Sequence, residues 1–194
     1  MSLVMNTFVS DIGDDVIPDW LKYFENAGMP CEIHPDFSFA DQSGFLPFKL
    51  SLMSPAHEEW LGKSYLTGFE FFIDDFDLAK EIDRRTEKPS GLKRLFGAKP
   101  EPIDFISPEV DARLADCKRV MSFVWGASDT FEMRMATVSA AILAEITNGV
   151  CGFPAYDEWY ENAGLVQKMA DDARDYEASL KPREFRLEEF EAWR

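Results

Sequence analysis

The amino-acid sequence predicts an α/β fold, with an α+β arrangement as the alternative, in a single domain spanning residues 1–194. Segments with the alternating or continuous apolar character of strands are interspersed with segments of helical periodicity. Apolar residues make up 46% of the chain and include 17 phenylalanines, enough for a substantial core. We therefore expect a mixed sheet of about five to six strands, flanked by helices.

The first half of the chain predicts one helix, three strands and a second, short helix. Pro18 suits the first turn of a helix that stops at Gly28. Strands are expected over 29–39, 44–53 and 67–74, followed by a helix over 75–85. Pro47 lies within the second of these strands, and its missing N–H predicts an edge or a bulge there.

The second half predicts a strand–helix–strand–helix unit. A β-branched and aromatic strand over 117–125 is followed by a helix over 129–147, which is apolar or small on nearly all sides and should be deeply buried. Asp129 and Glu132 form a start resembling a capping box. A short strand over 149–154 should then return parallel to the first one, as in a right-handed crossover. A last helix over 163–180 is followed by a C-terminal tail, residues 181–194.

Residues 86–104 are punctuated by proline and glycine and predict a long loop within the domain. Six basic residues and one acidic residue fall between Arg84 and Lys99, a local charge of +5 in an acidic chain. Two readings stay open: a mobile loop with an apolar turn resting on the body, or a docking loop or lid. The candidate binding residues in the second reading are Lys93, Arg94, Leu95 and Phe96.

Charge and cysteine content exclude several classes of protein. A net charge of −16 repels phosphate backbones and anionic lipids, so we expect no nucleic-acid or membrane partner. No apolar run approaches the ~18 residues of a membrane span, and no signal peptide is evident. Cys31, Cys117 and Cys151 are odd in number and lie far apart, which favours a reducing, cytoplasmic location.

The stretch "CEIHPDFSF" (31–39) contains the strongest candidate for catalysis. Odd positions are apolar and even positions are polar, a pattern typical of a half-buried strand. Cys31 should then face the core and His34 the solvent, so the two cannot form a nucleophile pair. The same pattern places Glu32, His34 and Asp36 on one face. Either this is an ordinary solvated surface, or it is the site of a small, hydrolase-like enzyme.

The sequence "DDFD" (74–77) places Asp74, Asp75 and Asp77 close together and raises the question of a metal site. It lacks the glycine and terminal glutamate of an EF-hand loop. Acidic residues at the start of a helix are also favoured by the helix dipole. We therefore expect a helix start and no metal, with the metal site as the weaker alternative. No phosphate-binding glycine motif occurs, and no cofactor is expected.

Residues 118–180 resemble a pattern found in uncharacterised bacterial proteins, some of them placed among the immunity proteins of polymorphic toxin systems. The stretch "RVMSFVWGASDTFEMRMATVSAAILAEITNGVCGFPAYDEWY" contains a strand, an alanine-rich helix, a short strand and an acidic–aromatic segment. The matching positions are Ala144, Thr147, Gly149, Val150, Asp157 and Trp159. The resemblance covers about a third of the chain. It departs from the pattern at Cys151 and Pro154, which stand where a second glycine and an aspartate often occur.

The resemblance implies a binding protein with no catalytic residues to carry over. Together with the charge, it leads us to expect a non-enzymatic, acidic, cytosolic protein that binds another protein, with a basic toxin as one candidate. The oligomeric state is open at this point.

Overall fold

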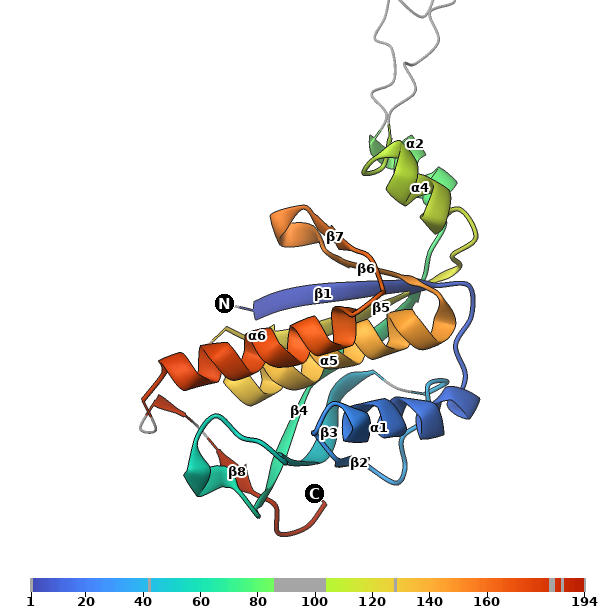
Figure 1. Cartoon of the computed structure of the whole chain (residues 1–194). Coiled ribbons are helices and arrows are strands. Elements are labelled where there is room, and N and C mark those ends of the chain that lie inside the picture. The colour runs from blue at the N-terminus through green and yellow to red at the C-terminus, as the bar shows by residue number, and fades with distance from the viewer. Residues whose placement is uncertain are drawn as a thin grey trace, which may run out of the picture.

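The computed structural model describes residues 2–41, 43–85, 104–127, 129–181, 184–185 and 187–193. These residues form a single compact α/β domain, which confirms the predicted fold class. Helices α5 and α6 lie side by side on one face of the sheet, and α1 packs beside α5 (Figure 1). Helices α2 and α4 lie together at one end of the molecule, next to β6 and β7 (Figure 1).

The strands are β1 (Ser2–Val9), β2 (Cys31–Ile33), β3 (Gly44–Ser51), β4 (Ser64–Asp75), β5 (Arg119–Gly126), β6 (Val150–Phe153), β7 (Glu158–Tyr160) and β8 (Glu188–Glu189). The helices are α1 (Ile17–Asn26), α2 (Leu78–Arg85), α4 (Pro108–Leu114), α5 (Thr130–Thr147) and α6 (Leu165–Ser179). Short 3₁₀ turns are η1 (Asp14–Val16), η2 (Glu58–Trp60) and η3 (Pro154–Tyr156).

The sheet has eight strands among the described residues, more than the sequence predicted. The order is β2-β3-β4-β5-β1-β6-β7, and β8 pairs with β4. Every described pairing is antiparallel, where a mixed sheet was expected. The expected crossover is nevertheless present: β5 and β6 are both antiparallel to β1 and therefore run parallel to each other. The strand β1 lies between them, so they do not pair directly.

The central strand β1 is the largest element that the sequence analysis missed. It pairs with β5 over its whole length and with β6 near its end. Met5, Thr7 and Val9 are buried on the α5 side, where the Thr7 hydroxyl donates to the Ala140 carbonyl at 2.9 Å. Phe8 is buried on the opposite face. Because both faces are covered, the simple alternation that marks a half-buried strand is lost.

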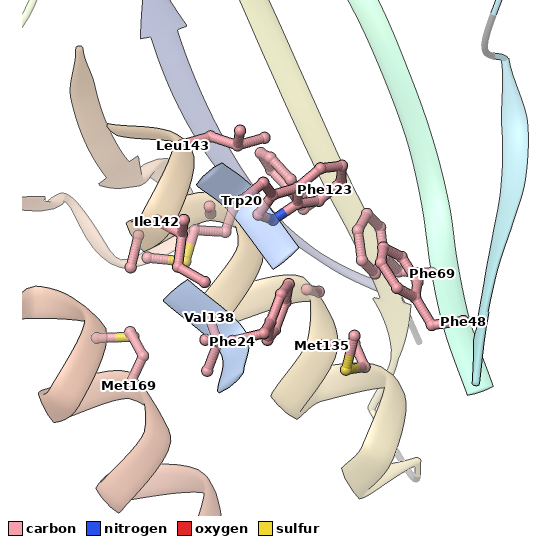
Figure 2. Close-up of a cluster of buried hydrophobic side chains, with 14 of the residues drawn as sticks. Trp20, Phe24, Phe48, Phe69, Phe123, Met135, Val138, Ile142, Leu143 and Met169 are labelled. Carbon is pink, nitrogen blue, oxygen red and sulfur yellow. The ribbon is translucent and has the colours of Figure 1, made fainter. Parts of the chain in front are cut away.

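The main core lies between the sheet, α1 and α5. Trp20 and Phe24 of α1 reach into the space between α5 and the sheet, where their rings meet Phe48 (Figure 2). Phe48 stacks on Phe69, which in turn contacts Phe123 of the next strand. A line of aromatic rings therefore crosses β3, β4 and β5 on this face.

A second, smaller core covers the opposite face of the sheet at one end. It contains Phe8, Phe76, Leu114, Cys117 and Val150. Side chains of α2 and α4 pack against it. This cluster explains why α2 and α4, which precede and follow the expected basic loop, remain attached to the domain.

The described residues of the C-terminal segment are packed against the body. Phe185 contacts the rings of His57 and Trp60. Beyond it, β8 pairs with β4, and the Phe190 backbone N–H donates to the Ser64 carbonyl. Near the end of the segment, the Trp193 ring packs against the ring of His34. Glu188 and Glu189, within the segment expected as a C-terminal tail, thus pair with the sheet. The loop residues 86–103, with the candidates Lys93, Arg94, Leu95 and Phe96, lie outside the described residues.

A buried ion pair joins α5 to α6. Arg134 donates from Nε and Nη2 to the two carboxylate oxygens of Glu177, at 2.9 and 2.6 Å. Both side chains are almost fully buried. His57 lies within hydrogen-bond distance of the Glu177 carbonyl. Removing one partner of such a pair leaves an uncompensated buried charge, while replacing both by apolar groups costs far less.

We expect Arg134→Met alone to reduce the free energy of unfolding by about 3–5 kcal/mol. The double variant Arg134→Met/Glu177→Leu should be more stable than the sum of the two single changes predicts. Urea melts of the four proteins in this cycle provide the measurement. Additive losses would show that the pair is not energetically coupled.

The depth of α5 gives a second prediction. Ile142 has no exposed surface and lies in the middle of the most buried helix. Ile142→Ala should cost about 2–5 kcal/mol, the range for large-to-small changes in a core. Denaturant melts measure this directly. The exposed Glu145 on the same helix is a control, since Glu145→Ala removes only an exposed hydrogen bond from the Tyr23 hydroxyl and no core contact.

Candidate functional site

The predicted strand over 31–39 is correct only for its first three residues. The strand β2 ends at Ile33, and a turn follows in which the His34 carbonyl accepts from the Phe37 N–H at 3.0 Å. Pro35 has no N–H to donate to a ladder, so extension beyond β2 is unfavourable. Phe37 and Phe39 still face the core, where both rings pack on Trp20.

The three candidate catalytic residues do not lie in a row on one strand face. Glu32 forms an exposed ion pair with Lys49 at 2.6 Å. His34 is half-buried, its Nδ1 accepts from the Asp36 backbone N–H at 3.2 Å, and its ring contacts Trp193. A small cavity of about 160 Å³ includes Glu32 and Cys31 in its lining. Neither His34 nor Asp36 is among the residues that line it.

Two of the aspartates at 74–77 make separate structural contacts, and Asp74 is exposed. Asp77 caps α2 and accepts from the Lys80 backbone N–H at 3.1 Å. The hydrogen bonds from the backbone and side chain of Lys80 lower the pKa of Asp77. Asp75 lies 3.7 Å from Arg119. Among the described residues, no three His, Cys, Asp or Glu side chains come together in a way that could hold a metal ion.

The cysteines are free and poorly suited to nucleophilic chemistry. Cys31 faces the main core, as predicted, and burial raises its pKa to about 12. Burial likewise raises the pKa of Cys151 to about 12 and raises that of Cys117. A thiol with such a pKa carries almost no thiolate at neutral pH.

A larger cavity, of about 410 Å³, lies beside β4, at the point where its neighbour in the sheet changes from β8 to β5. The ladder with β8 ends at Leu66, and the ladder with β5 begins at Glu70. Thr67 and Gly68 therefore lie in the gap between β8 and β5 along this edge of β4. The lining residues are Phe45, Pro47, Leu66, Thr67, Asp129, Phe131, Glu132, Leu187 and Glu188.

One wall of the cavity is aromatic and depends on a glycine. A Cβ at Gly68 would lie 2.1 Å from the Leu46 carbonyl oxygen and 2.7 Å from the Phe45 ring. Only a residue without a side chain lets the Phe45 ring lie across β4 in this way. Phe45 is nevertheless 48% exposed. Phe131, at the start of α5, is also in the lining of the cavity.

The carboxylates in the lining are placed by the start of α5. Asp129 caps the helix through one oxygen, which accepts from the N–H groups of Phe131 and Glu132. Glu132 reaches back and accepts from the Gly126 N–H at 2.9 Å. The predicted capping box therefore exists in modified form: the glutamate bonds the end of β5 instead of the cap residue.

These carboxylates form a negative region with no cation beside them in the described lining. Burial raises the pKa of Glu132, and the charges of Asp129 and Glu70 raise it further, against the hydrogen bond from Gly126. None of the described residues that line the cavity is basic. The arrangement suits a ligand that is cationic at one end and apolar along its length.

The sequence singled out two of the residues that line the cavity, but it did not predict that they lie together with the others. Asp129 and Glu132 were predicted only as helix-start residues. Phe45, Leu187 and Glu188 come from segments far apart in the chain, and nothing in the local pattern links them. The sequence signal that was present is Gly68 within an otherwise bulky strand, which indicates a close approach of another group.

Comparisons with known proteins give no relative from which a role could be transferred. The chain matches no protein-family model, no curated protein and no solved structure. Within the described residues, no helix is both long and apolar enough to cross a membrane. The site must therefore be interpreted from its own chemistry.

The raised pKa of Glu132 gives a prediction for stability. In the folded state this carboxyl binds its proton more tightly than in the unfolded chain, whose ordinary value is 4.5. The ionised form is therefore penalised at pH 7, and the penalty disappears as the pH falls through the raised pKa toward 4.5. Wild type should gain stability relative to Glu132→Gln over this window.

Urea melts of both proteins between pH 7 and pH 4.5 measure the difference. The glutamine retains an acceptor for Gly126, so the fold should be kept. Glu25→Gln, at an exposed position on α1, is the matched control and should show no such trend. A stability difference that is constant across the window would contradict the assignment.

Proposed function

We propose that this is a non-enzymatic, acidic protein that binds a basic protein partner, in the manner of an immunity protein or antitoxin. The cavity between β3, β4, the start of α5 and residues 187–188 is the observation that carries this proposal. It combines apolar walls with three carboxylates, in a chain whose net charge is −16. Such a surface attracts cationic partners and repels anionic ones.

The positions through which the chain resembles immunity proteins serve its scaffold. The Ala144 carbonyl accepts from the Gly149 N–H at 2.8 Å and from Asn162 Nδ2 at 3.1 Å. A Cβ at Gly149 would lie 2.5 Å from the Phe8 carbonyl oxygen, so glycine is required there. These contacts fix the turn from α5 into β6. Ala144 and Gly149 are therefore scaffold positions in this chain, and the binding residues must be sought elsewhere.

The competing enzyme proposal has weaker support from geometry. A general acid–base group must converge with its partner on a substrate position. Glu32 is instead paired with Lys49, and His34 is engaged with its own turn and with Trp193. The cavity that includes Glu32 is smaller than the acidic cavity and lacks the other two candidates.

The proposal predicts a salt-dependent complex with a basic protein. The candidates to test first are proteins of positive net charge encoded beside this gene, each purified and mixed with the full chain. We expect the association rate of the true partner to fall at least about tenfold between low salt and about 0.5 M salt. The dissociation rate should change much less. Stopped-flow fluorescence of the tryptophans gives both rates.

Co-expression supplies the functional test. If the partner is a toxin, growth arrest caused by it should be relieved by this chain. A partner that binds with a salt-independent association rate, or that this chain covalently alters, would contradict the proposal.

A further inference from the structure

The acidic cavity has the chemistry to take one particular kind of group. Its long walls are apolar, contributed by Phe45, Pro47, Leu66, Phe131 and Leu187. The carboxylates of Asp129, Glu132 and Glu188 lie in the same lining. A lysine or arginine side chain has the matching form, because an apolar stem carries a cation at its tip.

We propose that the cavity receives a single lysine or arginine side chain of the partner protein, with its stem along the apolar walls and its cation between Asp129 and Glu132. This inference rests on the proposed function and names the contact through which that function operates. It does not concern the diffuse negative surface, which would steer many cations without selecting a side chain.

The unused hydrogen-bonding capacity of the lining supports the assignment. Asp129 uses one carboxylate oxygen, Oδ1, as the helix cap, and Glu132 uses one, Oε2, for Gly126. Their other oxygens make no hydrogen bond or ion pair with the described residues and can accept from an ammonium or guanidinium group. Thr67 lines the same cavity, but its hydroxyl oxygen is buried away from it, so the two carboxylates supply the contacts to a cation.

The helix dipole is the main objection, because the start of α5 carries a partial positive charge. That charge is equivalent to roughly +0.5, and the first N–H groups are already capped by Asp129. The carboxylates of Asp129 and Glu132 outweigh it, and Glu70 lies close enough to raise the pKa of Glu132. A cation is therefore the favoured occupant.

The test uses the full chain and a five-residue peptide with one central lysine between glycines, blocked at both ends. The same peptide with arginine, and with the uncharged norleucine, completes the set. In ¹⁵N–¹H spectra, the lysine and arginine peptides should shift amides of residues 66–70 and 129–132. The norleucine peptide should bind at least about tenfold more weakly, since it has the stem but no cation.

Matched variants separate the cavity from general surface charge. Asp129→Asn/Glu132→Gln preserves the cap and the Gly126 bond while removing two charges. Glu25→Gln/Asp175→Asn removes the same charge at exposed positions on α1 and α6. The first pair should weaken lysine-peptide binding on the order of tenfold or more, and the second less than about twofold. Thermal melts confirm that both proteins are folded.

Equal losses in the two double variants would overturn the proposal, because they would assign binding to net charge. Shifts confined to other regions, or equal binding of the norleucine peptide, would also overturn it. The two proposals fail separately. If a basic protein binds wild type and both variants equally, the cavity assignment is wrong while the function stands. If the peptide binds in the cavity but no basic protein binds the chain, the function is wrong while the site stands.

Discussion

The helix α5 has almost no surface that can be exposed to water, and the rest of the domain is arranged around this constraint. From Val138 to Ala144 every residue is buried. A helix of this kind needs apolar neighbours on all sides, and the sheet, α6 and α1 provide them. Ala140 and Ala141 keep the helix close to the sheet, close enough for the Thr7 hydroxyl to bond the Ala140 carbonyl. The large rings of Trp20 and Phe24 fill the space that remains beside α5 (Figure 2).

The proposed binding site is a by-product of how this helix begins. The strand β5 ends at Gly126, where the chain turns into α5. The part of β4 that extends beyond β5 can then pair with the C-terminal segment. The strand β8 covers only the part of β4 up to Leu66. Between the two, the capping side chains of α5 meet the apolar edge of β4. Acidic residues stabilise a helix start, so the same residues that begin the helix also give the cavity its charge.

The sequence predicted those elements whose burial follows a simple periodicity. The helices α1, α5 and α6, and the strands β3, β4 and β5, lie where the pattern placed them, with Pro18 and Gly28 bounding α1 as expected.

The errors have specific causes. Alternation over 31–39 persists although the chain turns at Pro35, because Phe37 and Phe39 reach Trp20 from a loop. The strand β8 is too short to show a period, and its pairing depends on contacts of Phe185 with His57 and Trp60. The cavity joins residues that are distant in sequence; Gly68 signals a close approach in β4, but the sequence does not say which residues meet there.

The position of β1 has a consequence for how the chain folds. The first strand in the sequence occupies the middle of the sheet, and its partners are residues 119–126 and 150–153. More than a hundred residues must therefore be gathered before the central ladder can form, and loop-closure entropy opposes that step. Topologies dominated by such distant pairings fold slowly. During synthesis, the hairpin of β3 and β4 with α1 can assemble early, while β1 must wait for β5. Until then, its apolar residues are exposed to the surrounding solution, and the nascent chain is most vulnerable to aggregation in this interval.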